Sequence, residues 1–176
     1  MVHIEESHEL LKSHMNKQMK KVIIESRFSS SDVEGLVRNK KFTLACMRDC
    51  FMRGEAPYAS HVIYAQTHIL DDFVANERAI GMHAGFCWGD LGELTVVYTD
   101  LGISSGMQMG VEHAEKVGRP VEYRELGYIP TVTKQDILLE EQIIKSQKEL
   151  LEIIKQEIHP ESKICLSNMV NKSNKI

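Results

Sequence analysis

The chain has 176 residues, 43% of them hydrophobic, and a net charge of −4 at pH 7. This length is enough for one domain with a buried core. The acidic balance argues against a general binder of nucleic acid polymers or anionic membranes. Because no apolar run suits a membrane span or a signal peptide, we expect a soluble cytoplasmic protein.

The cysteines follow no pattern of metal binding. Cys46, Cys50, Cys87 and Cys165 form no CxxC pair and show no zinc spacing. We therefore expect reduced, buried thiols, which agrees with a cytoplasmic setting. We expect neither a metal site nor a cofactor.

The first half of the chain alternates strand and helix patterns. Residues 1–19 predict a weakly amphipathic helical extension, and the apolar run Val22 to Ile24 predicts a buried strand. A cluster of serines ending at Asp32 offers an N-cap for a helix over residues 33–52, which Gly54 would end. A second strand is expected over residues 58–60.

The second half of the core continues the alternation. A helix is expected to begin near Ala75, and its small residues Gly81, Ala84 and Gly85 would let it pack closely on a sheet. The segment "LTVVYT" predicts the third strand, and a helix over residues 106–117 follows it. The segment "VEYREL" predicts the fourth strand.

These elements together predict an α/β domain over residues 20–130. Apolar strands that alternate with helices are typical of a parallel sheet covered on both sides. We expect a small Rossmann-like or flavodoxin-like unit. In such sheets, ligands bind outside the carboxyl ends of the strands, where the strand order reverses.

The C-terminal region is predicted to be helical and then polar. Residues 131–158 contain the clearest helical pattern, with apolar pairs repeating at intervals of three and four. This broad apolar stripe predicts docking on the same or a neighbouring subunit, and we expect a homo-oligomer. Residues 159–176 form a polar tail rich in Lys and Asn.

Two candidate site groups follow the first two strands. Ser26 and Arg27, beside Phe28, are well placed to bind a phosphate or a carboxylate. A capping serine and a surface arginine would explain the same residues. His61 follows the second strand and could bind a base, a sugar or a phosphate, with a buried core histidine as the alternative.

A third group contains carboxylates. Asp71 and Asp72 precede Glu77 and Arg78 by about one helical turn. Clustered carboxylates near a cleft can raise each other's pKa, which suits acid–base or nucleophilic work. Helix capping would explain the same residues without chemistry.

The fourth group is the strongest anion site in the sequence. Ser104, Ser105, Gly106 and Met107 follow the third strand and open a helix. The free backbone N–H groups, the hydroxyl groups and the helix dipole at such a terminus all favour an anion.

The pieces "RGEAPYASH", "LDD" and "SSGM" carry a resemblance across residues 21–127. The chain resembles an uncharacterised bacterial and phage family, which is similar to the nucleoside 2-deoxyribosyltransferase-like superfamily with its nucleotide N-glycosidases. This resemblance implies a Rossmann-like, commonly dimeric fold that binds a nucleoside or its monophosphate. It also implies a catalytic Glu that acts at the anomeric carbon.

The resemblance carries over at one position and departs at another. Ser104, two residues before Gly106, matches the serine that binds the 5′-phosphate, whereas the Asp of many transferases is absent there. Gly110 stands where the catalytic Glu is expected, and glycosidic cleavage needs a carboxylate. Glu112 would lie on another helical face, so Asp72 and Glu77 are the candidate replacements.

Three functional hypotheses follow. The protein could cleave the N-glycosidic bond of a nucleotide, or it could hold a nucleotide signal without cleaving it, in the host cytoplasm if a phage encodes it. The third hypothesis is an oligomeric assembly module that acts through the helix over residues 134–157. The ligand expected in the first two cases is a nucleotide or nucleoside-type small molecule.

Overall fold

The sheet of the protein is parallel throughout. The computed structural model describes residues 7–12, 18–66 and 69–157, of which residues 155–157 are described by backbone alone. Its four strands have the order β2-β1-β3-β4. They are β1 (Lys20–Glu25), β2 (Glu55–Tyr58), β3 (Leu94–Tyr98) and β4 (Val121–Arg124). This arrangement confirms the predicted α/β class and is consistent with a Rossmann-like or flavodoxin-like fold.

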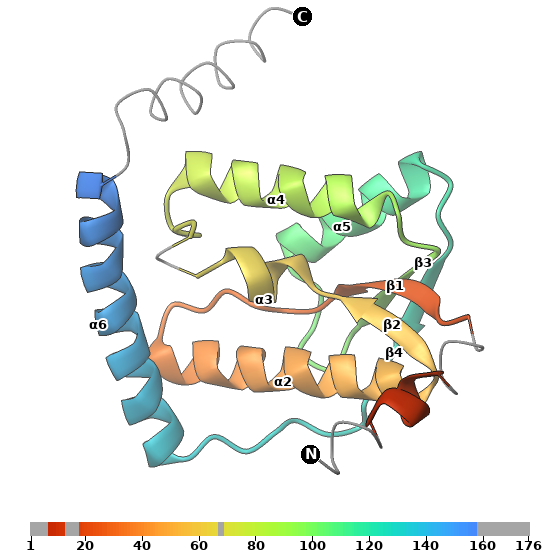
Figure 1. The fold of residues 1–176 in the computed structure, drawn as a ribbon, viewed down its shortest axis with the longest axis horizontal. Coiled ribbons are helices and arrows are strands. Elements are labelled where there is room, and N and C mark those ends of the chain that lie inside the picture. Colours follow the sequence, from red (N-terminus) through yellow and green to blue (C-terminus); the bar gives the residue numbers. More distant parts are fainter. Residues whose placement is uncertain (1–6, 13–17, 67–68, 158–176) are drawn as a thin grey trace, which may run out of the picture.

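Helices cover both faces of this sheet (Figure 1). Helix α2 (Val33–Met52) lies on one face, and α4 (Ala75–Gly89) and α5 (Ser105–Lys116) lie on the other. The short helix α3 (Ser60–Tyr64) lies between β2 and α4 in the sequence and packs against α4. The sheet is therefore enclosed, which explains why its strands are so apolar.

The long helix α6 (Lys134–Glu157) packs on α2 of its own chain. Two ion pairs fix this contact: Lys40 Nζ lies 2.5 Å from Glu140 Oε1, and Lys41 Nζ lies 2.8 Å from Asp136 Oδ2. Asp136 also accepts a hydrogen bond from the backbone N–H of Thr133, so it caps the first turn of α6.

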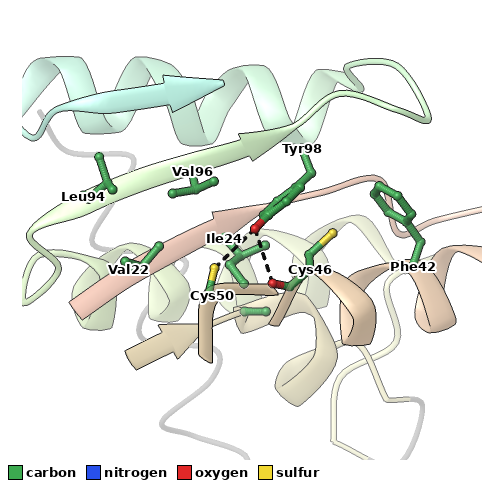
Figure 2. Packing of buried hydrophobic residues seen from close by; sticks show 9 residues of the cluster. Val22, Ile24, Phe42, Cys46, Cys50, Leu94, Val96 and Tyr98 are labelled. Atoms are coloured by element: carbon green, nitrogen blue, oxygen red, sulfur yellow. Dashed lines mark hydrogen bonds between the residues drawn. The ribbon is translucent and has the colours of Figure 1, made fainter. Parts of the chain in front are cut away.

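The main core lies between the sheet and α2 (Figure 2). Alternate residues of the strands face this layer, because successive side chains of a strand point to opposite faces. Figure 2 shows their side chains meeting those of α2: Val22, Ile24, Leu94, Val96 and Tyr98 from the strands, and Phe42, Cys46 and Cys50 from the helix. The intervening residues of β1, Ile23 and Glu25, consequently lie on the side of α4 and α5.

A buried ion pair joins the two edge strands. Arg124 at the end of β4 donates two hydrogen bonds, each of 2.8 Å, to the carboxylate of Glu55 at the start of β2. Both side chains are largely excluded from solvent. The hydrogen bonds from Arg124 hold the pKa of Glu55 below its usual value, although burial opposes them.

Two sequence predictions are wrong in detail. The second strand is Glu55–Tyr58 rather than residues 58–60, and Ser60–Tyr64 is helical. Pro57 is tolerated within β2 because this strand is at the edge of the sheet. Cys46 and Cys50 are buried free thiols as expected, but Cys87 is exposed, since it lies on the outer side of α4.

Some predictions fall partly or wholly outside the described residues. Residues 7–12 of the N-terminal extension are helical, and residues 1–6 and 13–17 lie outside the described part. Cys165 and the tail over residues 159–176 lie outside it as well. Within the described ranges, no helix has the length and apolar character that a membrane span requires.

The small residues of α4 serve a different contact from the one predicted. A Cβ atom on Gly85 would lie 2.7 Å from the Oγ and 2.9 Å from the Cβ of Ser60, so Gly85 lets α4 approach α3 rather than the sheet. A Cβ atom on Gly81 would lie 3.2 Å from Leu70 Cδ1, which is the far end of a flexible side chain, and 3.7 Å from Tyr64 Cβ, which is an ordinary van der Waals contact.

We expect Gly85→Ala to lower the free energy of unfolding by about 1–3 kcal/mol, because the added methyl group overlaps Ser60. Gly81→Ala on the same helix is the matched control. It should be neutral or stabilising by up to about 1 kcal/mol, since alanine favours helix more than glycine does. Urea unfolding checks both values, and equal effects of the two substitutions would contradict the close contact of α3 and α4.

Candidate functional site

A cavity of about 490 Å³ opens at the carboxyl ends of β1 and β3. The strand order reverses between these strands, which is where ligands bind in open α/β sheets. The predicted site residues, which lie far apart in the sequence, all line this one cavity: Ser26, Arg27, Phe28, His61, Asp72, Glu77, Ser104, Ser105, Gly106 and Met107. The topology therefore brings the predicted groups together.

The N-terminus of α5 forms one wall. Ser104 is the N-cap residue, and its Oγ accepts a hydrogen bond of 3.3 Å from the backbone N–H of Met107. The N–H of Ser104 in turn donates to Met107 Sδ. Because these contacts fix the turn before the helix, the first backbone N–H groups of α5 are held at the cavity, with the positive end of the helix dipole.

Arg78, which the sequence analysis did not select as a ligand-binding residue, lies beside this turn. A Cβ atom on Gly106 would come within 3.0 Å of Arg78 Nη2, so the guanidinium group lies against the first turn of α5. Its Nη1 donates to both carboxylate oxygens of Asp72, at 2.7 and 2.6 Å. The only signal for it in the sequence is its position directly after Glu77.

The opposite wall is held by buried polar contacts. Ser26 Oγ lies 2.8 Å from Thr43 Oγ1 on α2 and 3.0 Å from His61 Nε2 on α3. Asn39 Nδ2 donates to the carbonyl oxygen of Phe28, which anchors the loop after β1. These contacts fix the positions of Ser26 and Phe28 in the cavity wall.

His61 is neutral at neutral pH. Burial lowers its pKa to about 4, although the negative charge of Asp72 raises it. Its ring also packs edge-to-face on Phe28, with ring centres 5.3 Å apart. A neutral imidazole can donate or accept a hydrogen bond, but it adds no positive charge for an anion.

Both carboxylates predicted to be catalytic already have partners. Asp72 accepts from Arg78 and also from Ser29 Oγ, at 2.5 Å. Glu77 Oε2 accepts a hydrogen bond of 2.6 Å from the backbone N–H of Asp71. The two residues line the cavity, and their oxygens are used to hold the loop before α4 and the arginine beside α5.

A further carboxyl group, Glu25, enters the cavity from the end of β1. A Cβ atom on Gly110 of α5 would overlap the carboxyl group of Glu25, so the two positions share one volume. In the sequence, Glu25 is simply the residue before Ser26 at the end of the first strand. Its place opposite Gly110 depends on how β1 and α5 pack, which sequence spacing does not reveal.

The rest of the lining is mostly apolar. Phe86 is fixed by a stack on His113, with ring centres 4.3 Å apart. Further side chains extend this surface from α3, α4 and the segment between them: Tyr64, Leu70, Phe73 and Met82. A cavity that combines polar and charged groups with apolar and aromatic side chains suits a ligand with an anionic group and a flat ring system.

The described residues include no cluster of three or more His, Cys, Asp or Glu side chains arranged to hold a metal ion. The polar groups that do converge are arginines, hydroxyl groups, backbone N–H groups and carboxyl groups. These are groups that bind organic anions directly or exchange protons with them.

Comparison with known proteins gives a match to a family model. A family model described as a domain of unknown function (DUF7768) matches residues 20–124, which span the sheet from β1 to β4. No curated protein and no solved structure matches the chain.

Proposed function

The chain belongs to this DUF7768 family, and from that premise we propose that its cavity binds a nucleotide-type small molecule. The phosphate would lie at Ser104–Gly106, between the N-terminus of α5 and Arg78. The base would lie against the apolar part of the cavity, near Phe86. The buried free thiols suit a reducing compartment, and we propose that the protein works in the cytoplasm.

One observation carries this proposal: Arg78 Nη2 lies at the first turn of α5. A helix N-terminus provides backbone donors and a partial positive charge. The guanidinium group adds a full charge and a planar pair of donors, the arrangement that suits a phosphate group. A volume of about 490 Å³ is within the range of small-molecule sites, about 300–1,000 Å³.

We propose hydrolysis of the N-glycosidic bond as the reaction, because carboxyl groups line the same cavity as the phosphate site. Cleavage of a glycosidic bond passes through a transition state with positive charge on the sugar, which a carboxylate stabilises and a carboxylic acid assists by protonation. Holding the nucleotide intact is the competing outcome, and product analysis separates the two.

Calorimetric titration with the common ribonucleoside and deoxyribonucleoside monophosphates tests the binding proposal. We expect at least one monophosphate to bind with 1:1 stoichiometry. The matching nucleoside should bind at least tenfold more weakly, because it lacks the group that meets Arg78 and α5. Failure of every monophosphate to bind would contradict the proposal.

A further inference from the structure

Glu25 is held in an unusual place for a carboxyl group. It is the last residue of β1, and the strand aims its side chain away from the α2 core and toward α5. Gly110 faces it from the second turn of α5, with no side chain of its own. The carboxyl group of Glu25 therefore fills the space that a side chain on α5 would otherwise occupy.

The surroundings of Glu25 favour its protonated form. Burial raises its pKa to about 8, while the positive charge of Arg119 acts in the opposite direction. Arg119 directs its own hydrogen bonds to Thr95 Oγ1, at 2.8 Å, and to the carbonyl oxygen of Gly89, at 2.6 Å. Within the described part of the chain, Arg119 therefore acts on Glu25 as a nearby charge and forms no hydrogen bond with it.

The other charged and titratable groups that face this cavity do not neutralise Glu25. Arg78 from α4 is paired with Asp72, Arg27 after β1 donates to the carbonyl oxygen of Leu101, and His61 from α3 is neutral. Glu77 from α4 adds a negative charge that is bound to a backbone N–H. No cation in the described lining forms an ion pair with Glu25.

We propose that Glu25 is the catalytic acid of this cavity and supplies from β1 the carboxyl group that position 110 of α5 lacks. This inference rests on the proposed nucleotide binding and hydrolysis. Glu25 is better suited to the role than Asp72 or Glu77, because both oxygens of Asp72 accept hydrogen bonds from Arg78 or Ser29 and Oε2 of Glu77 accepts one from the Asp71 N–H. A protonated and unpaired carboxyl group can give its proton to a ligand.

The step balances with water as the only co-reactant. The Glu25 carboxyl group donates its proton to the base nitrogen, and the electron pair of the C–N bond leaves with the base. The oxygen of a water molecule bonds to the anomeric carbon, and the proton that this water loses returns to the Glu25 carboxylate. The products are the free base and the sugar phosphate, and the enzyme regains its starting state.

The direct test compares Glu25→Gln with the wild type, using the monophosphates that calorimetry shows to bind. We expect the wild type to release free base and Glu25→Gln to release it at least 100-fold more slowly, with affinity changed less than about threefold. Base release by Glu25→Gln within threefold of wild type would overturn the inference. So would intact nucleotide recovered from the wild type, a result that leaves the binding proposal standing.

Measuring the free energy of unfolding as a function of pH tests whether the Glu25→Gln variant is folded. The folded wild type keeps the Glu25 proton between pH 4.5 and about 8, and the unfolded chain loses it. The contribution of Glu25 to the free energy of unfolding therefore falls as pH rises from 4.5 to about 8. Glu25→Gln should remove this fall and be at least as stable as wild type at pH 8. Base release by the wild type should decline above about pH 8, where Glu25 loses its proton.

Exchanging the two positions tests the shared volume. In Glu25→Ala/Gly110→Glu, the carboxyl group comes from α5, and the alanine at position 25 leaves room for it. We expect at least tenfold faster base release than in Glu25→Ala/Gly110→Gln, its matched control. Equal rates in these two double variants would overturn the claim that both positions serve one carboxyl site.

Discussion

Arg124→Met is expected to lower the free energy of unfolding by about 3–5 kcal/mol, because it leaves the buried carboxylate of Glu55 without its partner. Arg124 also donates to Glu122, so the substitution releases a second contact on β4. Urea unfolding at pH 7 measures the change. The loss should become smaller as pH falls through the folded-state pKa of Glu55, since the pair stabilises the protein only while Glu55 is ionised.

Two controls isolate this effect. Arg53→Met removes an exposed ion pair with Asp49, and exposed pairs contribute less than about 1 kcal/mol. The double variant Glu55→Leu/Arg124→Met removes both buried charges, and it should recover much of the stability that the single substitution loses. If the free energy of unfolding of the single Arg124→Met variant is within 1 kcal/mol of the wild-type value, the ion pair does not stabilise the contact between the edge strands.

Arg78→Ala is expected to weaken binding of a nucleoside monophosphate by about 10- to 100-fold. Hydrogen bonds to a charged group contribute about 1.5–3 kcal/mol, and each 1.4 kcal/mol is a factor of ten in affinity. Arg78 Nη2 lies at the first turn of α5, where the phosphate is proposed to bind. Calorimetry with the same panel of monophosphates measures the effect.

The matched control for Arg78→Ala is Asp72→Asn. It keeps the arginine and removes the negative charge paired with it, so affinity should stay unchanged or increase. Arg48→Ala, on the exposed side of α2, should have no effect. Equal affinity in Arg78→Ala and wild type would place the phosphate elsewhere in the cavity, and loss of affinity in Arg48→Ala would indicate non-specific charge attraction.

The sequence was sufficient to predict the layers of this fold but not all of its connections. Periodicity identified β1, α2, β3, α5 and α6, since each has a long or strongly apolar pattern. It misplaced β2, which has only four residues and includes a proline. Short edge strands owe their structure to pairing with a neighbour, here β1, and local sequence reveals little of that pairing.

The functional site could likewise be predicted from the sequence only in part. The positions after each strand could be predicted, because parallel strands end at one edge of the sheet. Arg78 lies beside α5 because of how α4 and α5 pack, and Glu25 faces Gly110 because of how β1 and α5 pack, and spacing along the chain encodes neither arrangement. Gly110 was recognised as an anomaly in the sequence, and the reason for it lies 85 positions earlier, across the cavity.

The shared volume of Glu25 and Gly110 has an evolutionary consequence. The two positions constrain each other unequally: position 25 can become smaller while position 110 stays glycine, but a side chain at position 110 must displace the Glu25 carboxyl group unless position 25 has become small. Across family members, the two positions should therefore covary as mutually exclusive states. During evolution, the carboxyl group could therefore move from β1 to α5, provided that position 25 became small before position 110 gained a carboxyl group.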